Sequence, residues 1–236
     1  MVSIRSHLAR GRVAGFFRFS LCIFGFVSFI TARAADTNAL FQQWLSVQTN
    51  MQSWTADFAQ TRTLKVLAQP LVAPGKVWVR RGEFRWELGQ PAQTVVVRQP
   101  NQLLIMYPQL KRVEKYDLDA VPPGPVKDAL SLLDASLPRD RVSMEKQFRL
   151  IAASETNGVL QMALQPNSAS ARKFVGQVGI AFRTNDFSIA ATEMKFSDGS
   201  ILRNDFSNVV MNAPMADALF ELKPPPDFIV VEPLRQ

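Results

Sequence analysis

Residues 75–91, GKVWVRRGEFRWELGQP, place the strongest constraint on how this chain can fold. Two runs rich in β-branched and aromatic residues flank a break at Arg81-Gly82, and this pattern predicts a β-hairpin. In the second run, Phe84, Trp86 and Leu88 alternate with charged residues, so a strand places them on one face. We call this face the apolar floor. We expect a hydrophobic ligand to bind there, with some of the protein's own helices acting as a lid.

Strand patterns fill most of the chain, and short polar breaks separate them. The first half is predicted to contain strands at 54–63, 64–70, 75–81, 84–88, 93–98, 102–107 and 111–118. The second half is predicted to contain strands at 147–155, 159–165, 174–183, 187–196 and 200–211, with a hairpin turn at Asp198-Gly199. Neighbouring strands on short connections form an antiparallel meander. A sheet of about eleven or twelve strands curls and encloses an interior, filled either tightly or by a ligand.

Two segments have helical periodicity instead. The first is predicted over residues 38–51, with capping side chains at 36–38 and an apolar stripe that covers the sheet. The second lies in an insertion behind a proline-rich stretch, where Leu130 and Leu133 belong to an apolar stripe between Val126 and Leu137. A helix between two halves of a meander suits a lid or plug, although an ordinary crossover helix fits as well.

The C-terminal residues 224–226 are three consecutive prolines, which protect an edge strand from further pairing. After them, either Phe228 and Val230 or Ile229 and Val231 could close one edge of the sheet.

Residues 1–34 read as a signal peptide, and residues 35–236 as one binding domain. A start with four arginines precedes the apolar run SLCIFGFVSFI, which is too short for an ordinary membrane span. Ala32-Arg33-Ala34 has the small-x-small pattern of a signal-peptidase site, so we expect cleavage after Ala34 and export to the periplasm. Lipid attachment at Cys22 is rejected because Leu21, which is not small, precedes it.

Removal of residues 1–34 changes the net charge of the chain and the set of reactive side chains that it holds. Five arginines leave with it, so 22 basic residues face 20 acidic ones in the mature chain. The only histidine, His7, and the only cysteine, Cys22, also leave. The mature protein then has no imidazole base, no thiol and no His or Cys metal ligand, which excludes most hydrolase mechanisms. We expect no enzymatic activity, no metal and no cofactor.

Ordinary surface chemistry explains two patterns that could otherwise indicate other types of site. The rings and arginines near residue 84 could form a nucleic-acid platform, but alternation puts Phe84 and Trp86 on one face and Arg85 on the other. We expect no nucleic-acid partner. The paired carboxylates, such as Glu83 and Glu87, are explained by solvated strand faces rather than by a glycosidase site.

The remaining indication of a binding site is the set of large apolar side chains in strand patterns, which includes Trp54 and Phe58. Core packing explains most such residues. A cavity becomes plausible because about a dozen strands enclose more volume than one short helix can fill.

Several of these segments resemble the LolA family of periplasmic lipoprotein carriers. The resemblance lies in the pattern S-x-x-A-x-F-x-Q-T at residues 53–61, in GKVWVRRGEFRWELGQP, and in Leu219-Phe220 followed by the three prolines. It implies a mainly β fold of α+β type with a helical lid. In this fold a single curved antiparallel sheet forms an unclosed β-barrel of about eleven strands, and short helices cover its mouth.

The resemblance also implies a function. Such a carrier takes an acylated lipoprotein from an inner-membrane ABC transporter, shields its acyl chains, and passes it to an outer-membrane acceptor. An arginine at the position of Arg81 would latch the lid, although a hairpin one residue shorter than the family's leaves Arg80 as a second candidate. The acyl-chain contacts would be Phe84, Trp86, Leu88, Trp54, Phe58, Leu130 and Leu133. We expect a monomer.

An alternative function on the same fold is a module that senses a lipid signal, or one that carries another lipid such as a glycolipid or a lipid-linked metabolite. The operon around the gene would discriminate between them, since a lipid-export operon favours transport and a sigma-factor operon favours sensing.

Overall fold

The computed structural model describes residues 31–121 and 141–234. In the first of these ranges the strands are β1 (Ser53–Thr63), β2 (Leu71–Arg80), β3 (Glu83–Leu88), β4 (Thr94–Arg98), β5 (Gln102–Tyr107) and β6 (Arg112–Asp117). In the second they are β7 (Phe148–Thr156), β8 (Val159–Pro166), β9 (Val175–Arg183), β10 (Ile189–Phe196), β11 (Ile201–Met211) and β12 (Ile229–Val231). The helical pieces are α1 (Thr31–Asn50), η1 (Pro108–Leu110), α3 (Arg141–Gln147), α4 (Ala169–Arg172) and η2 (Asp217–Phe220).

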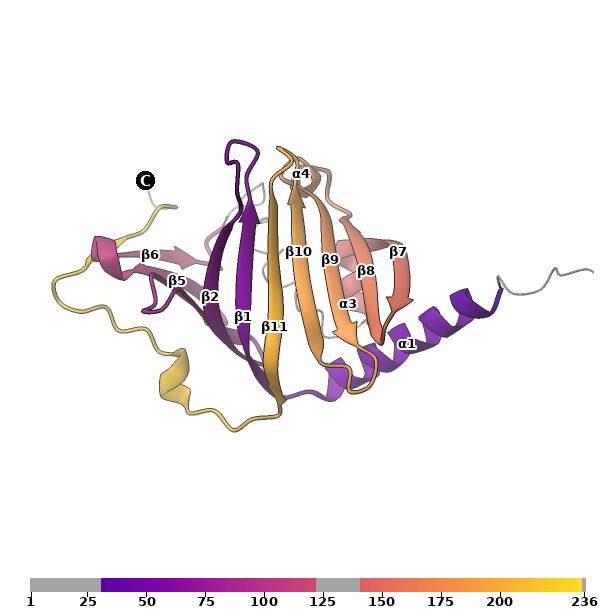
Figure 1. Cartoon of the computed structure of the whole chain (residues 1–236). Coiled ribbons are helices and arrows are strands. Elements are labelled where there is room, and N and C mark those ends of the chain that lie inside the picture. Colours follow the sequence, from indigo (N-terminus) through magenta and orange to yellow (C-terminus); the bar gives the residue numbers. More distant parts are fainter. Residues whose placement is uncertain (1–30, 122–140, 235–236) are drawn as a thin grey trace, which may run out of the picture.

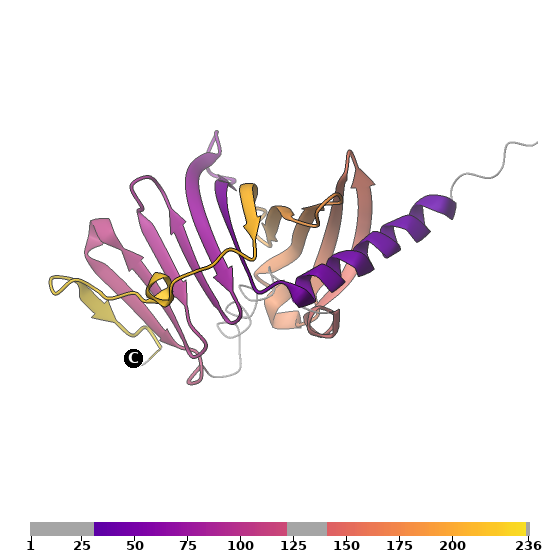
Figure 2. The ribbon, with the colours of Figure 1, turned by 90° about the horizontal axis from the view of Figure 1, so that it is seen from below.

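Within these ranges all twelve strands belong to one sheet, in the order β12-β6-β5-β4-β3-β2-β1-β11-β10-β9-β8-β7. Each half is a meander of neighbouring strands, and the long pairing of β1 with β11 joins the halves at the centre (Figure 1). The sheet is curved, and its two end strands, β12 and β7, do not pair with each other (Figure 2). The predicted fold class, an unclosed curved sheet with few helices, is confirmed.

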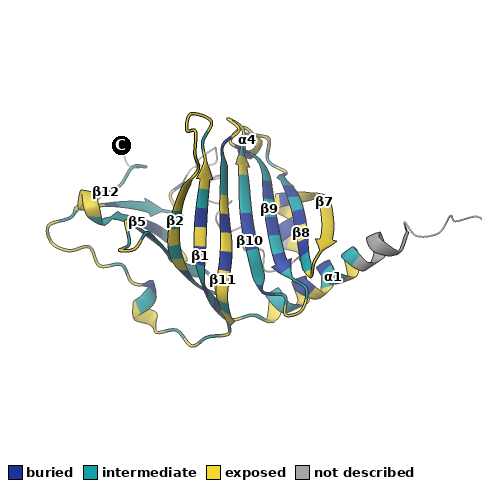
Figure 3. Ribbon diagram, viewed as in Figure 1, coloured by how far each residue is buried: buried dark blue, intermediate teal, exposed yellow. Residues whose placement is uncertain are grey.

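The two faces of the sheet differ in what they contact. On β1, Trp54, Ala56, Phe58 and Gln60 are buried, whereas the residues between them are more exposed. This period of two is visible as alternating colours along the central strands (Figure 3). We call the face that carries Trp54 and Phe58 the inner face and the opposite one the outer face.

Helix α1 packs on the inner face of the second half, where it contacts β7 and β8 (Figure 2). Its Trp44 ring stacks on Phe182 of β9 at a centroid distance of 4.7 Å and an angle of 7°. Phe41 and Leu45 are buried beside Trp44, one turn apart on the same helix face. The predicted apolar stripe therefore covers the sheet as expected. The helix begins earlier than predicted, at Thr31, because the alanines that precede residue 36 favour helix and continue it.

The predicted strand at 64–70 is wrong. These residues form the turn and loop between β1 and β2, and β2 begins only at Leu71. The partner strand β11 starts at Ile201, which pairs with Thr63, so the residues after Thr63 have no strand beside them on that side. Pro70 also lacks the N–H that a ladder needs. The other predicted strands of both halves are present within one or two residues at nearly every end.

The C-terminal strand β12 lies at an edge of the sheet, as the sequence predicted. It pairs with β6 in parallel, whereas every other pairing in the sheet is antiparallel. The chain reaches this edge after crossing from the end of β11, and such a crossover brings β12 in with the direction of β6 (Figure 1). Helix α3 was not predicted, and the predicted helix at 126–137 lies outside the described residues.

Near this edge, Tyr116 of β6 donates a hydrogen bond to Glu114 Oε2 at 2.9 Å. Burial, together with that bond, raises the pKa of Tyr116 to about 12. The unfolded phenol ionises near pH 10, so we expect the stability that Tyr116 contributes to be complete below about pH 10 and to be lost as the pH rises towards about 12. Tyr116→Phe should make the urea midpoint fall less between about pH 9 and pH 11.5 than in the wild type. An unchanged pH dependence would contradict the assignment.

Candidate functional site

The inner face of the β2–β3 hairpin forms an apolar floor. Cross-strand pairing puts Val79 opposite Phe84 and Val77 opposite Trp86, all on the inner face. The valines are buried, whereas the two rings are only half-buried. The turn at Arg81-Gly82 that the sequence predicted connects the strands, and Gly82 has φ +75°, a conformation that glycine adopts without strain. The predicted segregation of rings and charges is therefore confirmed.

Three aromatic rings from β1 and β11 complete this floor. Phe58 of β1 lies 4.1 Å from Trp86 between ring centroids. Phe206 of β11 makes edge contacts with Trp54, Phe58 and Trp86 at 5.8–6.2 Å. Such edge contacts each add about 0.5–1.5 kcal/mol beyond area burial. Leu88 packs against the same cluster. Of the predicted acyl-chain contacts, five thus meet in one cluster, and Leu130 and Leu133 lie outside the described residues.

A second apolar cluster lies under α1. It comprises Trp44 with its neighbours on α1, Met144 and Phe148, and inward residues of β8 and β9 that include Leu160 and Phe182. Nothing local in the sequence predicts that the two clusters would be neighbours. They share one sheet face only because β11, which lies 138 to 157 positions further along the chain at the paired residues, pairs with β1.

A small apolar space lies where the two clusters meet, at the C-terminal end of α1. Its lining includes Trp44 and Met51 from the helix side and Trp54, Ile189 and Met211 from the sheet. Its volume is about 20 Å³, enough for a single water molecule. An acyl chain needs far more room, so it can enter here only if α1 moves relative to the sheet.

A larger recess, of about 250 Å³, lies on the outer face of β7–β11. Small residues such as Ala163, Gly179 and Ala181 form its base, and Glu193 and Arg203 form part of its rim. This recess is larger than the inner space, but half of its lining is polar and it opens to solvent. Its chemistry does not suit a hydrocarbon chain, so the inner face is the candidate site.

The two arginines proposed as lid latches lie in different surroundings. Arg81 is exposed in the hairpin turn. Arg80 is on the outer face, where it forms ion pairs with Glu83 and Asp217, each at 2.5 Å, and its guanidinium lies 4.2 Å from the ring centre of Phe220. These carboxylates raise the pKa of Arg80.

Arg80 is thereby tied to the segment that follows β11. Phe220 in this segment is 1% exposed, and its carbonyl accepts a hydrogen bond from Gln99 at 2.9 Å. Arg85 of β3 donates to the carbonyl of Leu219 at 3.3 Å. Leu219-Phe220, which the sequence analysis singled out only as a motif, is thus the anchor that holds the C-terminal segment on the outer face of β2–β4.

Two other features bear on the kind of site. In the described part of the chain, no group of three or more His, Cys, Asp or Glu side chains is placed to hold a metal ion. No helix in the described ranges has the length and apolarity needed to cross a membrane.

A curved, unclosed sheet with an apolar inner face and a helix packed on it defines a half-open β-barrel protein. Residues 49–223 match the family described as outer membrane lipoprotein carrier protein LolA. The chain belongs to this family. Its members are carriers rather than enzymes, and their name implies lipoprotein cargo.

Two relatives with the same description match at low identity. The chain is 26% identical over 214 residues to an outer-membrane lipoprotein carrier protein of Coxiella burnetii, covering 89% of this chain and 90% of the relative. It is 25% identical over 183 residues to the protein of that name from Bordetella avium, covering 77% and 82%. Among solved structures, a LolA superfamily protein from Nitrosomonas europaea aligns with a TM-score of 0.42 and 9% identity, covering 79% of this chain and 97% of that one.

Proposed function

We propose that this protein is a periplasmic carrier that shields the acyl chains of lipoproteins on the inner face of its sheet and carries them from the inner to the outer membrane. The observation that supports this most directly is the half-buried pair Phe84 and Trp86. Large rings that stay half-buried on the inner face leave apolar surface for a guest, whereas a plain core would bury them.

The energetic need for such a surface follows from the cargo. Each methylene taken out of water contributes about 0.8 kcal/mol, so a chain of about 15 methylenes is worth roughly 12 kcal/mol. Unshielded chains would not cross an aqueous compartment. Release must also be possible, which favours a site that opens and closes over one that binds rigidly.

In this proposal α1 separates from the sheet to admit the chains, since the space beneath its end is small. Leu130 and Leu133, which lie outside the described residues, would also contact the chains in this proposal. The donor is an inner-membrane ABC transporter and the acceptor lies in the outer membrane. The chain is exported with residues 1–34 removed after Ala34, which N-terminal sequencing of the mature protein tests.

The binding experiment compares two tryptophans on neighbouring strands. Trp86 faces inward, whereas Trp78 faces outward beside Lys76, whose Nζ lies 5.5 Å from the ring centre. We expect Trp86→Ala to weaken binding of a triacylated lipopeptide at least tenfold, because it removes a ring from the binding surface. Trp78→Ala should leave the affinity within a factor of two. Folding of both variants is checked by circular dichroism before titration.

If the wild-type protein binds no acylated ligand, the carrier proposal fails. If it binds a free lipid but not the lipopeptide, the alternative of a lipid sensor, or a carrier of another lipid, replaces it. Mass spectrometry of lipid extracted from protein purified from its own periplasm would identify that lipid.

The latch is tested separately with Arg81→Leu and Arg80→Leu. If Arg81 holds the lid, its replacement should trap cargo, and transfer to acceptor membranes should fall. Because Arg80 is tied to Glu83 and Asp217, its replacement should instead loosen the C-terminal segment. Cleavage by a glutamate-specific protease after Glu221, an exposed residue in that segment, measures this loosening. Normal transfer by the Arg81 variant would remove Arg81 from the proposal.

A further inference from the structure

Three polar side chains lie side by side on the inner face. Gln60 of β1 pairs with Asn204 of β11, and Asn204 pairs with Thr192 of β10. All three are buried, with exposed fractions of 8%, 5% and 7%. We call these three residues the polar seam.

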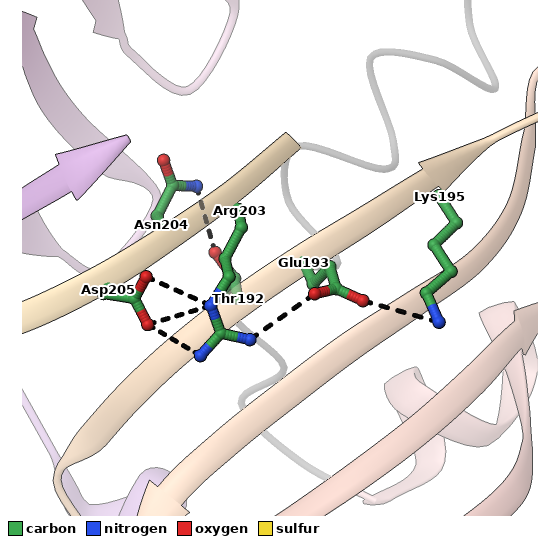
Figure 4. Close-up of polar contacts among 6 residues, drawn as sticks. All are labelled: Thr192, Glu193, Lys195, Arg203, Asn204 and Asp205. Carbon is green, nitrogen blue, oxygen red and sulfur yellow. Dashed lines mark hydrogen bonds and ion pairs between the residues drawn. The ribbon is translucent and has the colours of Figure 1, made fainter. Parts of the chain in front are cut away.

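Hydrogen bonds connect the seam from strand to strand. Gln60 Nε2 donates to Asn204 Oδ1 at 3.0 Å, and Asn204 Nδ2 donates to Thr192 Oγ1 at 3.1 Å. Figure 4 shows the second of these bonds. It also shows that the sequence neighbours of the seam form a separate set of ion pairs, from Asp205 through Arg203 and Glu193 to Lys195. Alternation places the charges outside and the uncharged groups of the seam inside.

The seam lies between the two apolar clusters. Gln60 follows Phe58, which belongs to the cluster on β1–β3, by two residues on the same face. Thr192 pairs with Ile180 of β9, which belongs to the cluster under α1. No seam residue belongs to either cluster, so the apolar surface of the inner face is interrupted by a short polar line.

A surface that served only for packing would not need buried polar side chains. Burying an amide or a hydroxyl costs about 1–3 kcal/mol unless it is hydrogen-bonded, and apolar side chains of similar size carry no such cost. The chemistry of the three groups also allows more bonds than the two that join them. Each amide has a second N–H, and the hydroxyl of Thr192 can donate as well as accept.

We propose that the polar seam binds the carbonyl oxygens at which acyl chains join their headgroup, as esters or amides. The ligand class is then an acyl ester or amide whose chains extend over the apolar clusters on either side. Uncharged N–H and O–H donors suit a neutral carbonyl better than a carboxylate or a phosphate, which would favour cationic partners. This inference rests on the proposed function, because it assumes that acyl chains occupy the inner face.

The test uses two probes that differ only in the carbonyl. 1-Palmitoylglycerol carries an ester, and 1-hexadecylglycerol carries an ether on a chain of the same length. Each competes with a bound fluorescent acyl probe on the mature protein. We expect the wild type to bind the ester about tenfold more tightly than the ether, the effect of one hydrogen bond.

Three variants separate recognition from packing. Thr192→Val keeps the shape but removes the hydroxyl, so it should lower the affinity for the ester several-fold and leave the affinity for the ether unchanged. Thr192→Ser keeps the hydroxyl and should keep the preference, and it also serves if the valine variant does not fold. Thr55→Val is the matched control, because Thr55 lies on the outer face and donates to the carbonyl of Val77 at 2.8 Å. It should change neither affinity.

Equal binding of ester and ether by the wild type would overturn the inference and leave the carrier proposal intact. An equal loss of both affinities in Thr192→Val would also overturn it, because the seam would then only align strands. If the wild type binds the triacylated lipopeptide but neither probe, the inference is overturned and the carrier proposal stands. If it binds none of the three, the proposed function fails and the inference fails with it.

Discussion

Gly75→Ala is expected to destabilise the protein by about 3 kcal/mol or more, the largest effect that one added methyl group should have in this sheet. Gly75 lies on the inner face of β2, directly opposite Phe58 in the register. A Cβ at this position would overlap Cζ and Cε2 at the edge of the Phe58 ring and lie 2.5 Å from the backbone oxygen of Glu87. The ring could turn away, but the carbonyl belongs to the β3 ladder and cannot. The urea midpoint measures the loss.

The control for this prediction is Gly176→Ala in β9. A Cβ there meets nothing closer than the carbonyl oxygen of Lys195 at 3.8 Å, an ordinary contact. Alanine also loses less backbone entropy than glycine on folding, so this variant should be neutral or slightly stabilised. Equal midpoints for the two variants would show that the packing of Phe58 on Gly75 is not as described. Combining Gly75→Ala with Phe58→Leu should recover only part of the stability, because the contact with Glu87 remains.

Trp44→Ala is expected to cost about 3–5 kcal/mol and to release α1 from the sheet. Trp44 is 3% exposed and stacks on Phe182, so its removal takes away a large ring that anchors the helix on the sheet. The inner face of β8 and β9 should then become accessible. A rise in the fluorescence of an added apolar dye, together with a lower urea midpoint, measures both effects.

Trp44→Phe separates loss of the stack from loss of helix structure. A phenyl ring can still lie on Phe182, so this variant should keep most of the stability and bind little dye. If Trp44→Ala binds no more dye than Trp44→Phe does, α1 is held by other contacts, and the opening proposed for cargo entry needs another hinge.

Some of the contacts behind these predictions could be predicted from the sequence, and others could not. Alternation along 84–88 correctly placed Phe84, Trp86 and Leu88 on one face, because the direction of a strand side chain depends only on its position. The turn at Arg81-Gly82 and the apolar stripe of α1 were also predictable, because each depends on residues that lie close together in the sequence. The error at 64–70 shows the limit, since a strand also needs a neighbour with which to pair.

The positions of Arg80 and Phe220 depended on contacts between distant residues. Both residues attracted notice in the sequence, but 140 positions separate them, and nothing local predicts that a guanidinium would lie on that ring. The polar seam was missed for a similar reason. Gln60 could be seen as a polar residue in an apolar alternation, yet only the pairing of β1, β11 and β10 brings it beside Asn204 and Thr192.

The sequence by itself determined a mainly β chain, the faces of its strands, and a first helix with an apolar stripe, because these follow from side-chain periodicity over a few residues. Only the tertiary structure decided that β1 and β11 join the two halves, that α1 covers one half, and that two apolar clusters meet across a polar line. Those outcomes depend on register between strands far apart in the chain, and register depends on the fit of whole faces rather than on any one segment.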